Sequence, residues 1–168
     1  QQRKEGGAPV VPVSVEVSEQ LRVVAITGPN TGGKTVTLKS IGLAALMARA
    51  GMWLPCNGSP SLPWCAQVLA DIGDEQSLQQ SLSTFSGHVK RIGSILQSIA
   101  SGPSPALVLL DEVGAGTDPS EGTALAIALL RNLANCARLT IATTHFGELK
   151  ALKYSDSRFE NASVAFDS

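Results

Sequence analysis

Residues 28–35 have the types and spacing suited to holding phosphate groups. They read GPNTGGKT, which fits the pattern G-x-x-x-x-G-K-[ST]. Glycines in such a loop let backbone N–H groups surround phosphate oxygens, and the lysine reaches the outer phosphates. The hydroxyl after the lysine is a ligand for Mg²⁺, which takes few protein ligands and keeps several waters. The pattern predicts a nucleoside triphosphate bound by Gly28, Pro29, Asn30, Thr31, Gly32, Gly33, Lys34 and Thr35, with Mg²⁺ held by Thr35. A glycine-rich turn that fits by chance is the alternative, and the strand and helix predicted on either side of the loop argue against it.

Two adjacent carboxylates, Asp111 and Glu112, follow the apolar run Leu107–Leu110. A buried strand that ends there delivers both side chains to the carboxyl edge of the sheet, where α/β folds bind ligands. Asp111 is predicted to complete the Mg²⁺ site with Thr35, and Glu112 to orient and deprotonate the water that attacks the outer phosphate. An enzyme with its own base fits this pair better than a switch GTPase, which positions water with a glutamine. A solvated acidic turn is the alternative.

Histidines occur at two positions with different surroundings. His145 follows the predicted strand Leu139–Thr144, so it lies at the same edge and could sense the outer phosphate by hydrogen bonding. We therefore predict that Lys34, Glu112 and His145 form the catalytic set, with a purely structural His145 as the alternative. His88 lies beside Lys90 and Arg91 on a helix face that the spacing predicts to be polar and solvated.

The segment Gly114–Asp118 reads GAGTD and follows the acidic pair directly. Its glycines allow close backbone approach, which suits contact with a second subunit or a moving ligand. A flexible loop ahead of a capped helix is the alternative.

Apolar periodicity predicts strands that alternate with helices. The predicted strands are Leu21–Ile26, Val68–Ile72, Leu107–Leu110 and Leu139–Thr144, with an edge strand at Val10–Val17 and the start of another at Val164–Phe166. The predicted helices run from the glycine loop to about Ala50, from Ser86 to Ala100, and from the N-cap Asp118 through Pro119 and Glu121 to Ala134. Prolines exclude regular structure over Leu54–Trp64. This order predicts an α/β P-loop NTPase whose mostly parallel sheet is flanked by helices.

Length and composition fit one such domain. The chain has 168 residues, of which 43% are hydrophobic and 16% charged, and this indicates a sizeable core. A formal charge of -1 gives no basic surface for nucleic acid, so contact with DNA or RNA is expected outside this chain. No apolar stretch is long enough to span a bilayer. We expect residues 1–9 to form a polar lead-in and residues 10–168 to form the P-loop domain.

Four segments together resemble the ATPase domain of the MutS family. They are ITGPNTGGKT at 26–35, DIGDEQS at 71–77, LSTFSGH at 82–88 and LDEVGAGTDP at 110–119. Residues 73–77 and 117–119 resemble the second MutS branch, which bears an Smr nuclease domain, more than the mismatch-repair branch. The resemblance covers nearly the whole chain from about Val10.

This resemblance implies an ABC-type, Mg²⁺-dependent ATPase that works as a homodimer. Ser83 of one subunit would contact the outer phosphate held by the other, and ATP hydrolysis would drive the conformational cycling of the dimer. The implied partners are DNA, branched or mismatched, in suppression of recombination, or a stalled ribosome. Both would bind through regions outside this chain, because the resemblance implies further domains before Gln1 and after Ser168.

Some alternatives stay open at this point. The chain could be the ATPase domain of a mismatch-repair MutS, or a nucleotide-gated binding module that turns ATP over little as an isolated fragment. A cytoplasmic location is expected, or a plastid if the source is a plant or alga. No membrane partner is expected.

Overall fold

A computed structural model of the chain describes residues 12–28, 33–73 and 81–164, except for the side chains of residues 81–84. Its strands are β1 (Val23–Thr27), β2 (Gln67–Asp71), β3 (Ala106–Leu110), β4 (Leu139–Thr144) and β5 (Phe159–Ser163). Its helices are α1 (Lys34–Arg49), α2 (Ser81–Ser101), α3 (Pro119–Cys136), the 3-10 helix η2 (Gly147–Ala151) and α4 (Leu152–Ser155). The described strands form one parallel sheet in the order β2-β3-β4-β1-β5. The predicted α/β class with a parallel sheet is confirmed.

The strand order brings distant segments of the chain to one edge. β4 lies between β1 and β3, and the register pairs Ile26 with Thr143 and Leu110 with Ala142. The strand that leads into the glycine loop and the strand that precedes Asp111 are thus separated by one strand, roughly 10 Å from axis to axis. The carboxyl ends of β1 and β3 therefore lie at the same edge of the sheet.

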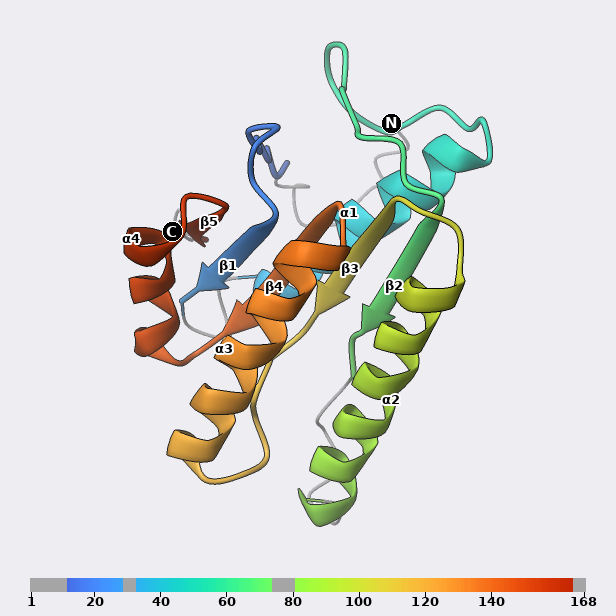
Figure 1. The fold of residues 1–168 in the computed structure, drawn as a ribbon. Coiled ribbons are helices and arrows are strands. Elements are labelled where there is room, and N and C mark those ends of the chain that lie inside the picture. The colour runs from blue at the N-terminus through green and yellow to red at the C-terminus, as the bar shows by residue number, and fades with distance from the viewer. Residues whose placement is uncertain (1–11, 29–32, 74–80, 165–168) are drawn as a thin grey trace, which may run out of the picture.

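Helices cover both faces of the sheet. Figure 1 shows α2 and α3 in front of the sheet and α1 behind it. Because successive side chains of a strand point to opposite faces, Leu107 and Leu109 of β3 pack in one cluster with Leu38 of α1, whereas Val108 and Leu110 pack in the other with Leu130 of α3. Two apolar cores, one on each face, therefore hold the sheet.

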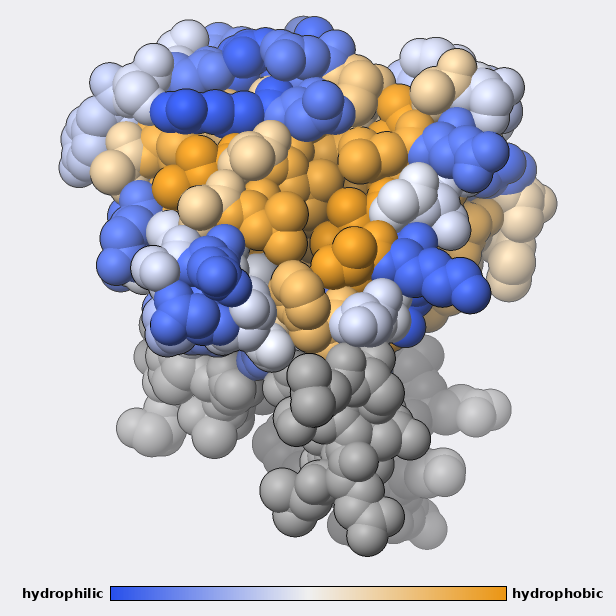
Figure 2. All heavy atoms as spheres, turned by 60° about the horizontal axis from the view of Figure 1, so that its bottom comes forward, coloured by the Kyte–Doolittle hydropathy of each residue, from blue (hydrophilic) through white to orange (hydrophobic). Residues whose placement is uncertain are grey.

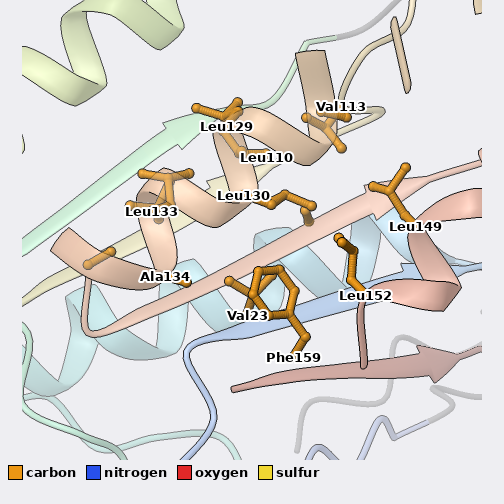
Figure 3. Close-up of a cluster of buried hydrophobic side chains, with 14 of the residues drawn as sticks. Val23, Leu110, Val113, Leu129, Leu130, Leu133, Ala134, Leu149, Leu152 and Phe159 are labelled. Carbon is orange, nitrogen blue, oxygen red and sulfur yellow. The ribbon is translucent and has the colours of Figure 1, made fainter. Parts of the chain in front are cut away.

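The core beneath α3 is shown in Figure 3. Leu130 and Leu133 are nearly inaccessible to solvent and lie over the sheet, where Val23 of β1 and Phe159 of β5 complete the cluster. Burying each such leucine stabilises the fold by about 1.5–3 kcal/mol. The core fixes α3, and with it the loop that precedes α3 and follows the acidic pair.

Asp118 caps α3 as predicted. Its Oδ1 accepts hydrogen bonds from the hydroxyl of Ser120 at 2.6 Å and from the backbone N–H groups of Ser120 at 2.9 Å and Glu121 at 3.4 Å. These bonds, that of the Ser120 hydroxyl foremost, hold the pKa of Asp118 below its usual value. Pro119 begins the helix, where a missing N–H costs nothing.

Some predicted boundaries differ from the structure. The edge strand expected at Val10–Val17 is wrong over its described part, residues 12–17. Val13 and Val15 are about half exposed, and β1 already pairs with β4 and β5, so it offers them no free edge. The last strand is β5 at 159–163, ahead of the predicted Val164–Phe166, of which 165–166 lie outside the described residues. Its sequence FENAS carries too many polar residues to give an apolar pattern.

Candidate active site

The two ends of the glycine loop are described, and residues 29–32 lie between them outside the described ranges. Gly28 and Gly33 adopt φ angles of 143° and 78°, a region that side chains with a Cβ rarely enter. Lys34 is the first residue of α1 and is 2% exposed. Its Nζ donates a hydrogen bond to the carbonyl oxygen of Gly28. The lysine side chain is therefore turned back toward Gly28.

Asp111 connects the loop to the sheet. Thr35 donates from Oγ1 to Oδ2 of Asp111 at 2.8 Å, and Thr143 of β4 donates from Oγ1 to Oδ1 of Asp111 at 2.5 Å. Asp111 is 7% exposed, and a buried carboxylate needs such donors. The structure thus brings together Thr35 and Asp111, the two residues predicted to hold a metal.

Thr143 was not among the predicted site residues. Besides its bond to Asp111, its Oγ1 accepts a hydrogen bond from the backbone N–H of Glu112 at 2.8 Å, and its carbonyl oxygen accepts one from Val113 at 3.0 Å. Thr143 therefore holds the side chain of Asp111 and the backbone N–H groups of Glu112 and Val113, the three residues that follow β3. The available signal was a pair of threonines closing a buried apolar strand next to the acidic one.

Glu112 has an unusual backbone conformation. Its φ of 49° lies in the left-handed region, and it is the only described residue other than glycine with a positive φ. Such a conformation costs a non-glycine residue about 1–2 kcal/mol, and strain of this kind persists where the surroundings enforce it. Glu112 is partly exposed, unlike Asp111, so the two carboxylates have different surroundings, and their separate roles stay predictions.

The loop after Glu112 packs closely against two other elements. A Cβ on Gly114 would lie 2.4 Å from the carbonyl oxygen of Gly122 in α3, and a Cβ on Gly116 would lie 3.3 Å from Cβ of Phe85 in α2. The backbones of Gly114 and Gly122 therefore touch directly. This part of the predicted Gly114–Asp118 segment is packed, whereas its contact with a second subunit stays a prediction.

His145 lies at the end of β4, as predicted. Its ring is exposed and stacks at a tilt on Phe146, with the ring centroids 4.4 Å apart. The buried Phe146 in turn packs against Gly114 and Gly122. The role of His145 as a phosphate sensor stays a prediction.

The prediction that His88 lies on a solvated face is wrong. Its side chain is 14% exposed, and its Nδ1 lies 2.6 Å from Oδ2 of Asp71, the last residue of β2. Arg91 of the same helix donates from Nε to Oδ1 of Asp71. The spacing of three residues puts His88 and Arg91 on one side of α2, and the buried carboxylate of Asp71 draws both toward the sheet.

Some of these residues line a pocket at the carboxyl edge of the sheet. Its polar lining residues are Asp71, His88, Asp111 and Glu112, and its apolar lining residues include Ile92 of α2 and Leu125 of α3. Figure 2, which turns the bottom of Figure 1 forward, shows apolar residues at the centre of this view and hydrophilic residues above them and to both sides. The side chain of Ser83 lies outside the described residues.

The fold and these residues define a class of protein: a parallel α/β domain with a glycine loop and an acidic strand end at one edge of its sheet. The profile of MutS domain V matches residues 24–168. The chain therefore belongs to the MutS family.

Relatives place it in the second branch of that family. The chain is 63% identical over 182 residues to the endonuclease MutS2 of Synechocystis, a match that covers 99% of this chain and 22% of that protein. The endonuclease MutS2 proteins of Symbiobacterium thermophilum and Clostridium botulinum are 54% and 52% identical, each over 94% of this chain and 20% of the relative. These matches confirm the predicted resemblance and favour the second branch over the mismatch-repair alternative.

The chain spans about a fifth of the length of the curated relatives it matches. Among the described residues, no helix is long and apolar enough to cross a membrane.

Proposed function

We propose that this domain binds ATP with Mg²⁺ at the carboxyl edge of its sheet and hydrolyses it, as an ABC-type ATPase. The observation that carries the proposal is the hydrogen bond of 2.8 Å between Thr35 and Asp111, which are 76 residues apart in the sequence. A hydroxyl next to the loop lysine and a buried carboxylate at a strand end are the pair that P-loop NTPases use for Mg²⁺. We choose ATP as the nucleotide because the chain resembles the ATPase domain of the MutS family.

The donor set fits Mg²⁺. Thr35 and Asp111 offer oxygen ligands, which this small hard ion prefers, and few protein ligands leave room for waters and phosphate oxygens. When bound, the ion neutralises charge on the phosphates. In the proposal Lys34 exchanges its bond to the carbonyl oxygen of Gly28 for the outer phosphates.

Glu112 accepts the proton of the attacking water in this proposal. Thr143 holds the Glu112 backbone N–H at 2.8 Å, so the carboxylate is directed by a fixed backbone and not by a free loop. His145 senses the outer phosphate from the neighbouring strand end. Most of the rate enhancement then comes from positioning and from charge stabilisation.

Two identical subunits complete the site in the proposal. Ser83 of α2 would approach the outer phosphate bound by the partner, and hydrolysis would reset the dimer on branched DNA or on a stalled ribosome. Those partners would bind through other parts of the full-length protein.

The hydrolysis is tested by two substitutions in the full-length protein. Lys34→Ala should abolish ATP binding, whereas Glu112→Gln should keep ATP bound and lose turnover, because only the base is removed. Lys39→Ala, on the exposed side of α1, is the matched control and should behave as the parent. Parental turnover by Glu112→Gln would refute the assignment of the base.

The composite site is tested by mixing. Full-length subunits with Ser83→Ala are combined with subunits carrying Lys34→Ala, so that each heterodimer holds one intact site. Turnover should recover in the mixture. Demonstrated heterodimers without recovery would contradict a shared site.

The choice between partners needs one comparison. ATP turnover of the full-length protein is measured with branched DNA and with collided ribosomes, each against the protein alone. Stimulation by one of them alone would identify the partner.

A further inference from the structure

The contacts of Asp71 link a helix to the catalytic edge. Asp71 ends β2 and is 2% exposed. Its carboxylate holds both His88 and Arg91 of α2, while its carbonyl oxygen accepts a hydrogen bond of 2.8 Å from the backbone N–H of Asp111. Asp71 is thus hydrogen-bonded through its side chain to α2 and through its backbone to Asp111, the candidate metal ligand.

Helix α2 makes a second polar contact with β2 near its other end, where Gln67 donates from Nε2 to the carbonyl oxygen of Ser98 at 3.2 Å. Among its described side chains, 85–101, Ile95 alone is buried, at 6% exposure, and the apolar Ile92, Leu96 and Ile99 are partly buried. Apolar packing is non-directional, so these apolar contacts alone do not set the position of the beginning of α2 along the sheet. The two hydrogen bonds from His88 and Arg91 to the buried carboxylate of Asp71 are directional, so they fix the position and the orientation of this part of α2.

A second contact lies one turn away. Phe85 lies against the backbone of Gly116, in the loop that follows Glu112. The first half of α2 therefore contacts the sheet at Asp71 and the loop after Glu112 at Gly116. A shift of α2 would therefore be expected to displace both Asp111 and Glu112.

We propose that Asp71 is a positioning residue for turnover, acting through His88 and Arg91. By fixing the first half of α2 to the strand end beside Asp111, it sets where the segment at 83–85 stands relative to the acidic pair. The inference rests on the proposed hydrolysis and deepens it, because it names the contact that links the helix of Ser83 to the residues that bind the metal and the water.

The experiment uses the full-length protein and separates binding from chemistry. Equilibrium ATP affinity and turnover per bound nucleotide are measured for Asp71→Asn, His88→Ala and the double variant. We expect each to lower turnover about 10-fold, as misplacement of a catalytic group does, while ATP affinity stays within about 2-fold of the parent. The double variant should lose no more than either single one, because the two residues act through one contact.

Matched variants distinguish positioning from general loss of stability. His88→Asn keeps a hydrogen-bonding group near the place of Nδ1 and should restore turnover to within about 3-fold of the parent. Lys90→Ala removes an exposed charge from the same helix, and Asp156→Asn breaks another Asp–Arg pair, with Arg158. Both should keep parental turnover. If Asp71→Asn fails to fold, the comparison of His88→Ala with His88→Asn decides.

The outcomes separate the inference from the proposed function. If Asp71→Asn and His88→Ala turned ATP over at the parental rate, the inference would be overturned and the proposed hydrolysis would stand. Equal losses in His88→Ala and His88→Asn would also overturn it. A parental protein without turnover would overturn the proposed hydrolysis, and the inference with it.

Discussion

Thr143 donates a hydrogen bond from its hydroxyl to the carboxylate of Asp111 over 2.5 Å. The two residues belong to neighbouring strand ends and are 32 positions apart in the chain. The same hydroxyl accepts a hydrogen bond from the N–H of Glu112, so it satisfies one buried acceptor and one partly buried donor at once.

Removing this hydroxyl should therefore be costly. Thr143→Val keeps the shape of the side chain but leaves the Glu112 N–H without that partner and deprives Asp111 of one donor. We expect a loss of about 1–3 kcal/mol in the free energy of unfolding, together with slower ATP turnover. Chemical denaturation and steady-state kinetics measure the two effects.

Thr140 provides a control in the same strand. It is 0% exposed, and its Oγ1 is the one buried side-chain oxygen or nitrogen of the described residues without a hydrogen-bond partner. Thr140→Val should therefore leave stability unchanged or raise it by about 1 kcal/mol. If the two valine variants lost stability equally, the hydrogen bonds of Thr143 would not be the cause.

The positive φ of Glu112 predicts an inverted order of stability between two small residues. At 49° the Cβ of alanine is strained and glycine is not, so Glu112→Gly should be more stable than Glu112→Ala by about 1 kcal/mol. Both variants lack the carboxylate, which removes its contacts from the comparison. Ala124 is the control, because it is an exposed helical position where alanine is more stable than glycine. Ala124→Gly should lower the free energy of unfolding by about 1 kcal/mol. Thermal unfolding that ranks Ala above Gly at 112 would contradict the backbone conformation.

The contact between Gly114 and Gly122 predicts a steric effect. Gly122→Ala would bring its Cβ to 2.3 Å from the carbonyl oxygen of Gly114, and the backbones would have to separate. We expect a loss of about 1–3 kcal/mol and reduced turnover, because the displaced loop follows Glu112. Gly93 of α2, where a Cβ meets nothing within 4 Å, is the matched control, and Gly93→Ala should gain about 0.5–1 kcal/mol.

A pH dependence is expected at Asp156. Its hydrogen bonds with Arg158 lower the pKa of Asp156 from 3.8 to about 2. A lowered pKa means that the pair stabilises the fold above about pH 3.8 and that this contribution is lost as the pH falls to about 2. A carboxyl NMR titration should show a midpoint near 2 in the parent and a return toward the usual value in Arg158→Leu. The same midpoint in both proteins would exclude Arg158 as the cause.

Local sequence patterns were enough to single out the candidate site residues that belong to short contiguous motifs. Lys34 and Thr35 follow from a contiguous loop pattern, and Asp111 and Glu112 follow from an apolar run that ends in two acids. The strands and the capped helix α3 follow from apolar periodicity and from Asp118 and Pro119. Each of these signals lies within about ten residues of the feature that it predicts.

The remaining parts depend on partners that only the folded chain brings near. Thr143 reads as an ordinary strand residue until β4 is inserted between β1 and β3. His88 reads as solvated because Asp71, its partner, is 17 positions away on another element. The strand predicted at Val10–Val17 fails for the same reason, since alternation cannot tell whether a neighbouring edge is free.

The touching backbones of Gly114 and Gly122 also limit how the domain can move. With no side chains between them, the turn after Glu112 and the first turns of α3 have no room to slide past one another. We expect a rotation of α3 to displace the backbone next to Glu112, and a spectroscopic label on the solvent side of that helix would measure this coupling.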